Sequence, residues 1–141
     1  MKTDTIFTVI PIVIGVLTYI TDKIITRRDR TISILNELID CYQTEIPKDR
    51  EDKDYFIKCK SFLGKVERMC IGIDAHVYCK RTVRRYGSKF LIYLYDRFEN
   101  YIIEQSRKQY QDSSKYNYLE KTVKSFRKTN KWRDRHVKIR H

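Results

Sequence analysis

The stretch TIFTVIPIVIGVLTYIT, residues 5–21, decides the architecture of this chain, because it holds seventeen residues without a charge. Asp4 and Asp22 bound it, and the sequence after Ile25 is charged and rich in tyrosine. At about 1.5 Å per residue, a helix over this stretch is roughly 26 Å long, near the short end of what crosses a hydrocarbon core of ~30 Å. The stretch therefore predicts a transmembrane anchor, which we place in residues 1–26.

A cleaved signal peptide and a buried core helix are the two alternatives to an anchor. Lys2 is offset by Asp4, and no small-x-small cleavage pattern follows the apolar run, so the sequence disfavours a signal peptide. The positive charges gather just after the run, which is followed by Lys23, Arg27, Arg28 and Arg30. The positive-inside rule then predicts a single-pass protein of the cell inner (cytoplasmic) membrane, with its N-terminus outside and its C-terminal body in the cytoplasm.

The body is expected to be helical, because its apolar residues recur three and four positions apart and few prolines or glycines interrupt them. One stripe covers residues 32–42 and a charged linker covers residues 47–54. The strongest stripe covers residues 56–73, a longer one residues 83–102, and a weaker helix residues 116–128. The predicted fold class is all-α, with a single N-terminal transmembrane helix followed by a small cytoplasmic bundle of three to four helices.

Four short runs in the body form a pattern, which consists of FLGKVERMCIGI at residues 62–73, Val77-Tyr78, Tyr86-Gly87 and Tyr101-Ile102. Over roughly residues 31–107 the chain resembles bacterial membrane-anchored helical proteins catalogued as domain of unknown function 4760. In that family a Leu-x-x-x-Glu-x-x-x-x-Gly helix leads into a Val-Tyr-Asp turn and a long helix that ends near an Arg.

Glu67 and Gly72 match the helix motif of that family, Tyr78 matches its turn, and Arg107 matches its distal Arg. Cys79 stands where the family usually has Asp, which removes an acidic helix cap. The resemblance implies an anchor followed by a helical bundle, and it implies no established activity.

No complete catalytic, metal-ligand or phosphate-loop pattern occurs, so we predict that the chain is not an enzyme and holds no metal or cofactor. The four cysteines lack C-x-x-C spacing, and in a reducing compartment we interpret them as small core residues. Glu67 lies beside the strongest apolar stripe. A buried carboxylate needs a partner, so we predict a structural ion pair with Arg97 or Arg84 of the facing helix. As chemistry, Glu67 could instead act as a general base or bind a ligand.

Basic residues dominate the charge, which is +12 in total and falls largely on the basic C-terminal helix and tail, residues 109–141, after a helical domain over residues 27–108. A basic ridge on the third helix is expected to bind an anionic ligand or partner through Arg81, Arg84, Arg85 and Lys89. The tail is interpreted as a surface for anionic lipid headgroups, formed by Arg127, Lys128, Lys131, Arg133 and Arg135. Binding of a nucleotide or nucleic acid, or simple solvation, are the alternatives for the tail.

Two functions fit this organisation. The first is a single-pass membrane-anchored cytoplasmic interaction module of unknown biochemical activity, which binds a protein partner or forms a homo-oligomer. The alternative is an oligomerising membrane effector that senses an anionic nucleotide or RNA signal, as in antiviral defence.

Overall fold

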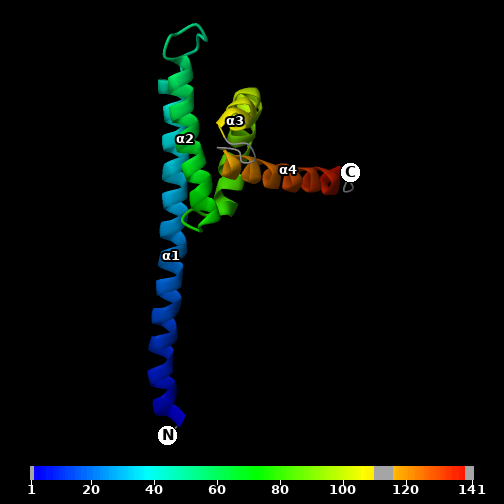
Figure 1. The fold of residues 1–141 in the computed structure, drawn as a ribbon. Helices are drawn as coiled ribbons and strands as arrows, with labels where there is room; N and C mark the ends of the chain where they lie inside the picture. The colour runs from blue at the N-terminus through cyan, green and yellow to red at the C-terminus, as the bar shows by residue number, and fades with distance from the viewer. Residues whose placement is uncertain (1, 110–115, 139–141) are drawn as a thin grey trace.

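A computed structural model describes the backbone of residues 2–109 and 116–138, and the side chains of residues 3–101 and 116–131. Over this part of the chain the regular structure is entirely helical, which confirms the predicted all-α class. The described helices are α1 (Lys2–Glu45), α2 (Tyr55–Asp74), α3 (Lys80–Gln109) and α4 (Asn117–Lys138). Figure 1 shows α1 as a long shaft with the other helices gathered beside its C-terminal half.

The first helix is uninterrupted over 44 residues, which corresponds to about 66 Å at 1.5 Å per residue. Its N-terminal half lies outside the bundle, and the large apolar side chains from Ile6 to Ile25 are 47–75 % exposed. The helix is long and apolar enough to cross a membrane, and no part of its most apolar window is buried in the fold. This half is therefore not a core helix of the described bundle.

Several hydroxyl groups in the exposed half are bonded within the helix itself. Thr8, Thr18 and Thr21 each donate to the backbone carbonyl four residues earlier, at 3.0, 2.9 and 2.8 Å. A hydroxyl bonded in this way presents no free donor to hydrocarbon. Pro11 lies within α1 without ending it.

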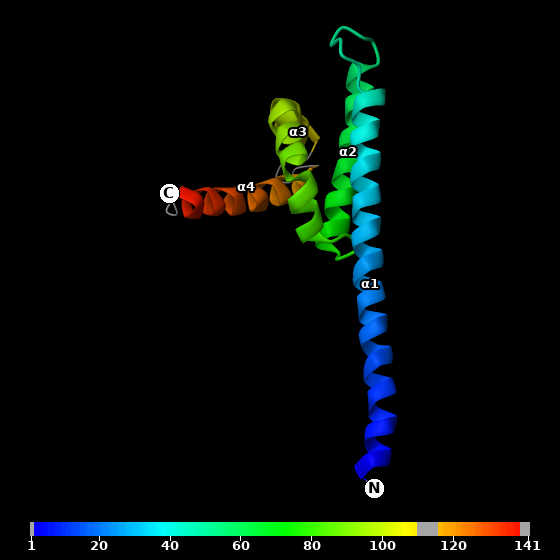
Figure 2. The same cartoon turned by 180° about the vertical axis from the view of Figure 1, so that it is seen from behind.

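The C-terminal half of α1 packs into the bundle. Thr31, Leu35 and Leu38 recur at helical spacing and are at most 3 % exposed. The second helix runs antiparallel beside this half, as both views show (Figures 1 and 2). The centre of the core consists of side chains that are fully buried, namely Phe62, Leu63, Val66, Val83, Leu91, Leu94, Leu119 and Phe126.

The fourth helix packs on α2 and α3, and Figure 2 shows it pointing away from α1 at a steep angle to it. Leu119, Val123 and Phe126 share one face of α4 and are at most 1 % exposed. The expected fourth helix is thus a core element, and its basic residues occupy the remaining faces.

The turn between α2 and α3 has a defined cap. The N–H of Val77 donates to the carbonyl of Gly72 at 2.8 Å, and the N–H of His76 donates to that of Ile73 at 3.1 Å. These two bonds form a Schellman motif, in which His76 takes the left-handed conformation with a φ of 60°. The turn then folds Tyr78 back over Gly72, whose missing Cβ would lie 2.5 Å from two carbons of the Tyr78 ring. This packing directs the start of α3 against α1.

Candidate anion-binding site

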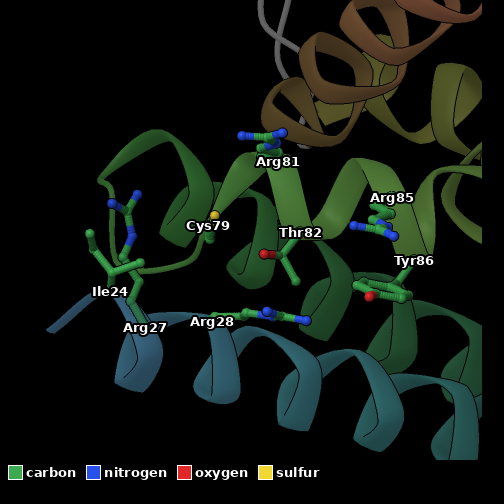
Figure 3. Close-up of a pocket in the computed structure, with 8 residues that line it drawn as sticks. All are labelled: Ile24, Arg27, Arg28, Cys79, Arg81, Thr82, Arg85 and Tyr86. Atoms are coloured by element: carbon green, nitrogen blue, oxygen red, sulfur yellow. The ribbon is translucent and has the colours of Figure 1, made fainter. Parts of the chain in front are cut away.

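A pocket of about 280 Å³ lies between α1 and the first turns of α3. Figure 3 shows Arg27 and Arg28 on the α1 wall, with Arg81 and Arg85 on the α3 wall. The pocket is completed by Ile24, Cys79, Thr82 and Tyr86. Four arginines thus share one cavity, and none of the residues that line it is acidic. Figure 3 shows their guanidinium groups pointing in different directions, that of Arg81 away from α1 and that of Arg27 toward the α2–α3 turn. Together they make the surroundings of the pocket positive, which favours an anion.

Hydrogen bonds between α1 and the α2–α3 turn hold the two walls together. The hydroxyl of Thr31 accepts the backbone N–H of Cys79 at 2.8 Å and donates to the carbonyl of Arg27 at 2.7 Å. The side chain of Arg27 donates through Nη2 to the carbonyl of Tyr78 at 3.1 Å. Because Thr31 is fully buried, this relay lies in the core and fixes the register of α1 against the start of α3.

The Nε of Arg27 is buried without a hydrogen-bond partner among the described residues. Buried polar groups are nearly always paired, so this N–H is an exception. Arg27 lines both this pocket and a second hollow beside the α2–α3 turn.

Cys79 immediately precedes the first residue of α3, the position of a helix N-cap. The hydrogen bond of its sulfur with the Thr82 hydroxyl lowers the pKa of the thiol most, backbone N–H groups of Thr82 and Arg81 add to this, and the charge of Arg27 acts in the same direction. The sulfur of Cys79 therefore occupies the capping position at which the family that this chain resembles usually has Asp. Thr82, the backbone N–H groups of the first turn and the charge of Arg27 therefore all favour the thiolate form of Cys79.

The sequence identified only part of this pocket. Arg81 and Arg85 of the predicted ridge line it, whereas Arg84 and Lys89 do not. Arg84 is rotated by about 100° from Arg85 around the helix, and Lys89 lies a turn further on. Sequence reasoning did not bring Arg27 and Arg28 to this pocket. They precede α3 by more than fifty residues and come near it only in the folded chain.

The predicted ion pair of Glu67 with Arg97 is corrected by the structure, which gives each group other partners. The two carboxylate oxygens of Glu67 accept the backbone N–H groups of Tyr118 and Leu119 at 2.9 and 2.8 Å. Burial raises the pKa of Glu67, and these two hydrogen bonds oppose the rise. The carboxylate thus caps the N-terminus of α4, and its partners are backbone N–H groups instead of an arginine.

Arg97 instead lies in a cluster of aromatic residues. Its Nη1 donates to the hydroxyl of Tyr42 and lies 3.5 Å from that of Tyr93. Its guanidinium also lies over the ring of Phe98, 5.4 Å from the centroid. Burial raises the pKa of Tyr42 to about 12, with the hydrogen bond to Tyr93 contributing. Arg97 therefore ties α1 to α3.

The predicted basic tail has different environments along its length. Arg127 pairs with Asp96 of α3 and lies 5.6 Å from the centroid of the Tyr95 ring, so this residue has a structural partner. Lys128 and Lys131 are exposed. The side chains of Arg133 and Arg135 lie outside the described residues, as does that of Arg107.

Cys59 and Cys70 are buried in the core, and Cys41 and Cys79 are half-buried. Burial raises the pKa of Cys70 to about 12, so this thiol stays protonated. In the described part of the chain no group of three or more His, Cys, Asp or Glu residues is placed to hold a metal ion.

Comparison with known proteins gives a match to a protein family. The family model described as Domain of unknown function (DUF4760) matches residues 18–127. No curated protein and no solved structure matches the chain.

Proposed function

The chain belongs to the family described as a domain of unknown function, DUF4760, and from that premise we propose that it is a single-pass membrane-anchored helical interaction module. The module is non-enzymatic and works in the cytoplasm at the inner membrane. The observation that carries this proposal is that one continuous helix is exposed and apolar at its N-terminal end and buried in the bundle at its C-terminal end.

The free energy gained by covering the exposed apolar side chains supports the anchor. Thirteen large apolar side chains lie exposed between Ile6 and Ile25, and covering one of them fully is worth about 1.5–3 kcal/mol. Partial exposure reduces the sum, which is still on the order of 20 kcal/mol. A bilayer covers such a helix on every side, as this distribution of exposed residues requires.

Charge supports the proposed orientation. The apolar segment is followed at once by Lys23, Arg27, Arg28 and Arg30, whereas only Lys2 precedes it. Positive residues of this kind tend to be retained on the cytoplasmic side, which supports a cytoplasmic bundle. Exposed aromatic side chains on the bundle, Phe56, Tyr86 and Tyr93, are the residue types that protein interfaces favour.

Membrane extraction and protease access test the anchor and its orientation. Expressed in bacteria, the full chain should float with membranes and resist alkaline carbonate, whereas a chain that starts at Arg27 should stay in the soluble fraction. Protease added outside spheroplasts should remove a tag from the N-terminus and spare the bundle. Extraction of the full chain by carbonate would refute the anchor, and protection of the tag would refute the orientation.

An oligomerising effector that responds to an anionic signal is the second candidate, and the arginine pocket favours it. A lone helix cannot form a pore, so this function requires several copies of the chain. Induction of the full chain should then reduce cell viability, and cross-linking in membranes should trap oligomers. A viable culture with only monomeric chain after cross-linking would remove this candidate.

A further inference from the structure

The arginine pocket lies where the exposed apolar part of α1 meets the bundle. Ile24 belongs to that apolar part, is 62 % exposed, and also lines the pocket. A second hollow shares Ile24 and Arg27 with this pocket. It is also lined by Asp22, Lys23 and the α2–α3 turn residues His76 and Val77. The bundle therefore reaches down to the end of the apolar segment, and the pocket opens beside it.

The chemistry of the pocket is one-sided. Arg27, Arg28, Arg81 and Arg85 bring four permanent positive charges to it, and its walls carry no carboxylate. Arginine forks match the oxygen atoms of phosphate in geometry as well as charge, so a phosphate group satisfies these donors.

The size of the pocket restricts the ligand. At about 280 Å³ it lies at the lower end of the roughly 300–1,000 Å³ of sites for drug-sized molecules. A phosphate with a small polar substituent fits this volume. The neighbouring Ile24 and the exposed apolar side chains before it offer a surface along which hydrocarbon chains can lie.

We propose that Arg27, Arg28, Arg81 and Arg85 bind the phosphate group of an anionic phospholipid, whose acyl chains lie along the apolar half of α1. This inference rests on the proposed membrane anchor, since only an inserted chain brings the pocket to the headgroups. The bound lipid joins α1 to the start of α3 and neutralises positive charge in the pocket. A soluble phosphate compound is the competing source of the same chemistry.

Lipid binding by the full chain in neutral detergent tests this site. We would titrate dioleoylphosphatidylglycerol, dioleoylphosphatidylcholine and glycerol 3-phosphate and count bound molecules by native mass spectrometry. Phosphatidylglycerol should bind more tightly than phosphatidylcholine, because the choline cation is repelled by the four arginines. Glycerol 3-phosphate, which lacks acyl chains, should bind weakly. Equal affinity for glycerol 3-phosphate and phosphatidylglycerol would overturn the lipid assignment in favour of a soluble ligand.

Two double variants distinguish binding in the pocket from long-range attraction by the positive charge of α3. Arg81→Gln with Arg85→Gln removes two charges from the pocket wall, and Arg84→Gln with Lys89→Gln removes two charges from the same helix outside it. A charge-assisted hydrogen bond contributes about 1.5–3 kcal/mol, so the pocket variant should weaken binding of phosphatidylglycerol about tenfold or more. The control variant should change it by less than about threefold, since only long-range attraction is lost. An equal loss in both variants, or no loss in the pocket variant, would overturn the site.

Insertion is measured separately, so that failure of the anchor is distinguishable from failure of the site. The unaltered chain and both double variants should float with vesicles of phosphatidylcholine alone. If all three float and the pocket variant binds phosphatidylglycerol normally, the site is wrong and the anchor stands. If none floats, the anchor itself is wrong and the lipid assignment falls with it.

Discussion

The carboxylate of Glu67 accepts the second and third backbone N–H groups of α4, the donors that a local N-cap side chain usually satisfies. A Glu67→Gln substitution keeps the shape but turns an NH₂ group toward one of these donors. The unpaired N–H should cost about 1–3 kcal/mol. For a bundle of this size the unfolding temperature of the full chain in detergent should fall by at least about 4 °C, as followed by circular dichroism.

A Glu45→Gln variant is the matched control. Glu45 pairs with Lys65 at 3.3 Å with both side chains substantially exposed, and such surface pairs contribute little. Its unfolding temperature should stay close to that of the unaltered chain. If the two variants melt alike, Glu67 does not hold α4 in place.

Cys79 should show a shifted reactivity with pH. The thiolate is the reactive form, and the hydrogen bond from Thr82 is the largest cause that lowers its pKa below 9.0. The rate of alkylation by iodoacetamide should therefore reach half its maximum at a lower pH than that of an unperturbed cysteine. Thr82→Val should move that midpoint upward, because the thiolate loses a donor. Mass spectrometry of the alkylated peptides gives the rate at each cysteine.

Thr44→Val provides the control for this measurement, since Thr44 bonds only to the carbonyl of Asp40 on an exposed turn of α1. It should leave the Cys79 midpoint unchanged. Cys70, whose pKa burial raises to about 12, should hardly react over the same range. An upward shift in the Thr44 variant as large as that in the Thr82 variant would contradict the assigned cause.

At this scale the sequence predicted which residues matter better than it predicted their partners. Glu67 was singled out because it borders an apolar stripe, but its partners are backbone N–H groups, which every residue type supplies and no sequence pattern marks. Arg81 and Arg85 were predicted to bind an anion, whereas the companion arginines of α1 come from a segment fifty residues earlier. Only packing of α1 against α3 brings these two groups together.

At the scale of elements, two glycines of α2 occupy opposite situations. A Cβ on Gly64 would meet nothing within 4 Å, whereas one on Gly72 would lie 2.5 Å from the ring of Tyr78. Gly64→Ala should stabilise the bundle by up to about 1 kcal/mol, because alanine favours the helix. Gly72→Ala should destabilise it by about 1–2 kcal/mol, because the ring must leave its place. Thermal unfolding of both variants gives the two signs, and stabilisation by both would show that Tyr78 does not rest on Gly72.

The helices themselves were predictable because their apolar residues repeat at helical spacing over about three to six turns. The predicted anchor and the predicted stripe over residues 32–42 belong to one uninterrupted helix, α1. The steep crossing of α4 was not predictable, since it depends on how Leu119, Val123 and Phe126 fit between α2 and α3. Spacing identifies an apolar face and says nothing of the angle at which another helix meets it.

At the scale of the whole molecule, α1 divides into one half that faces the surroundings and one that faces the core. Figure 1 shows this division as a shaft that leaves the bundle below the α2–α3 turn. Because the two halves face different surroundings, substitutions in the exposed half should change membrane insertion, and substitutions in the buried half should change folding stability. Ile14 is 57 % exposed and Leu38 is 2 % exposed, so these two residues of one helix provide the test.

Ile14→Arg should weaken membrane insertion and leave the bundle intact, because an arginine at the middle of a spanning helix costs about 2.5–3.5 kcal/mol. More of this variant should be extracted by alkaline carbonate, while its unfolding temperature in detergent stays unchanged. Leu38→Ala should do the reverse, since truncating a buried leucine costs about 2–5 kcal/mol of folding stability and removes nothing from the apolar segment. If either variant changes both extraction and unfolding, the two halves of α1 are coupled, and the bundle depends on the membrane for its stability.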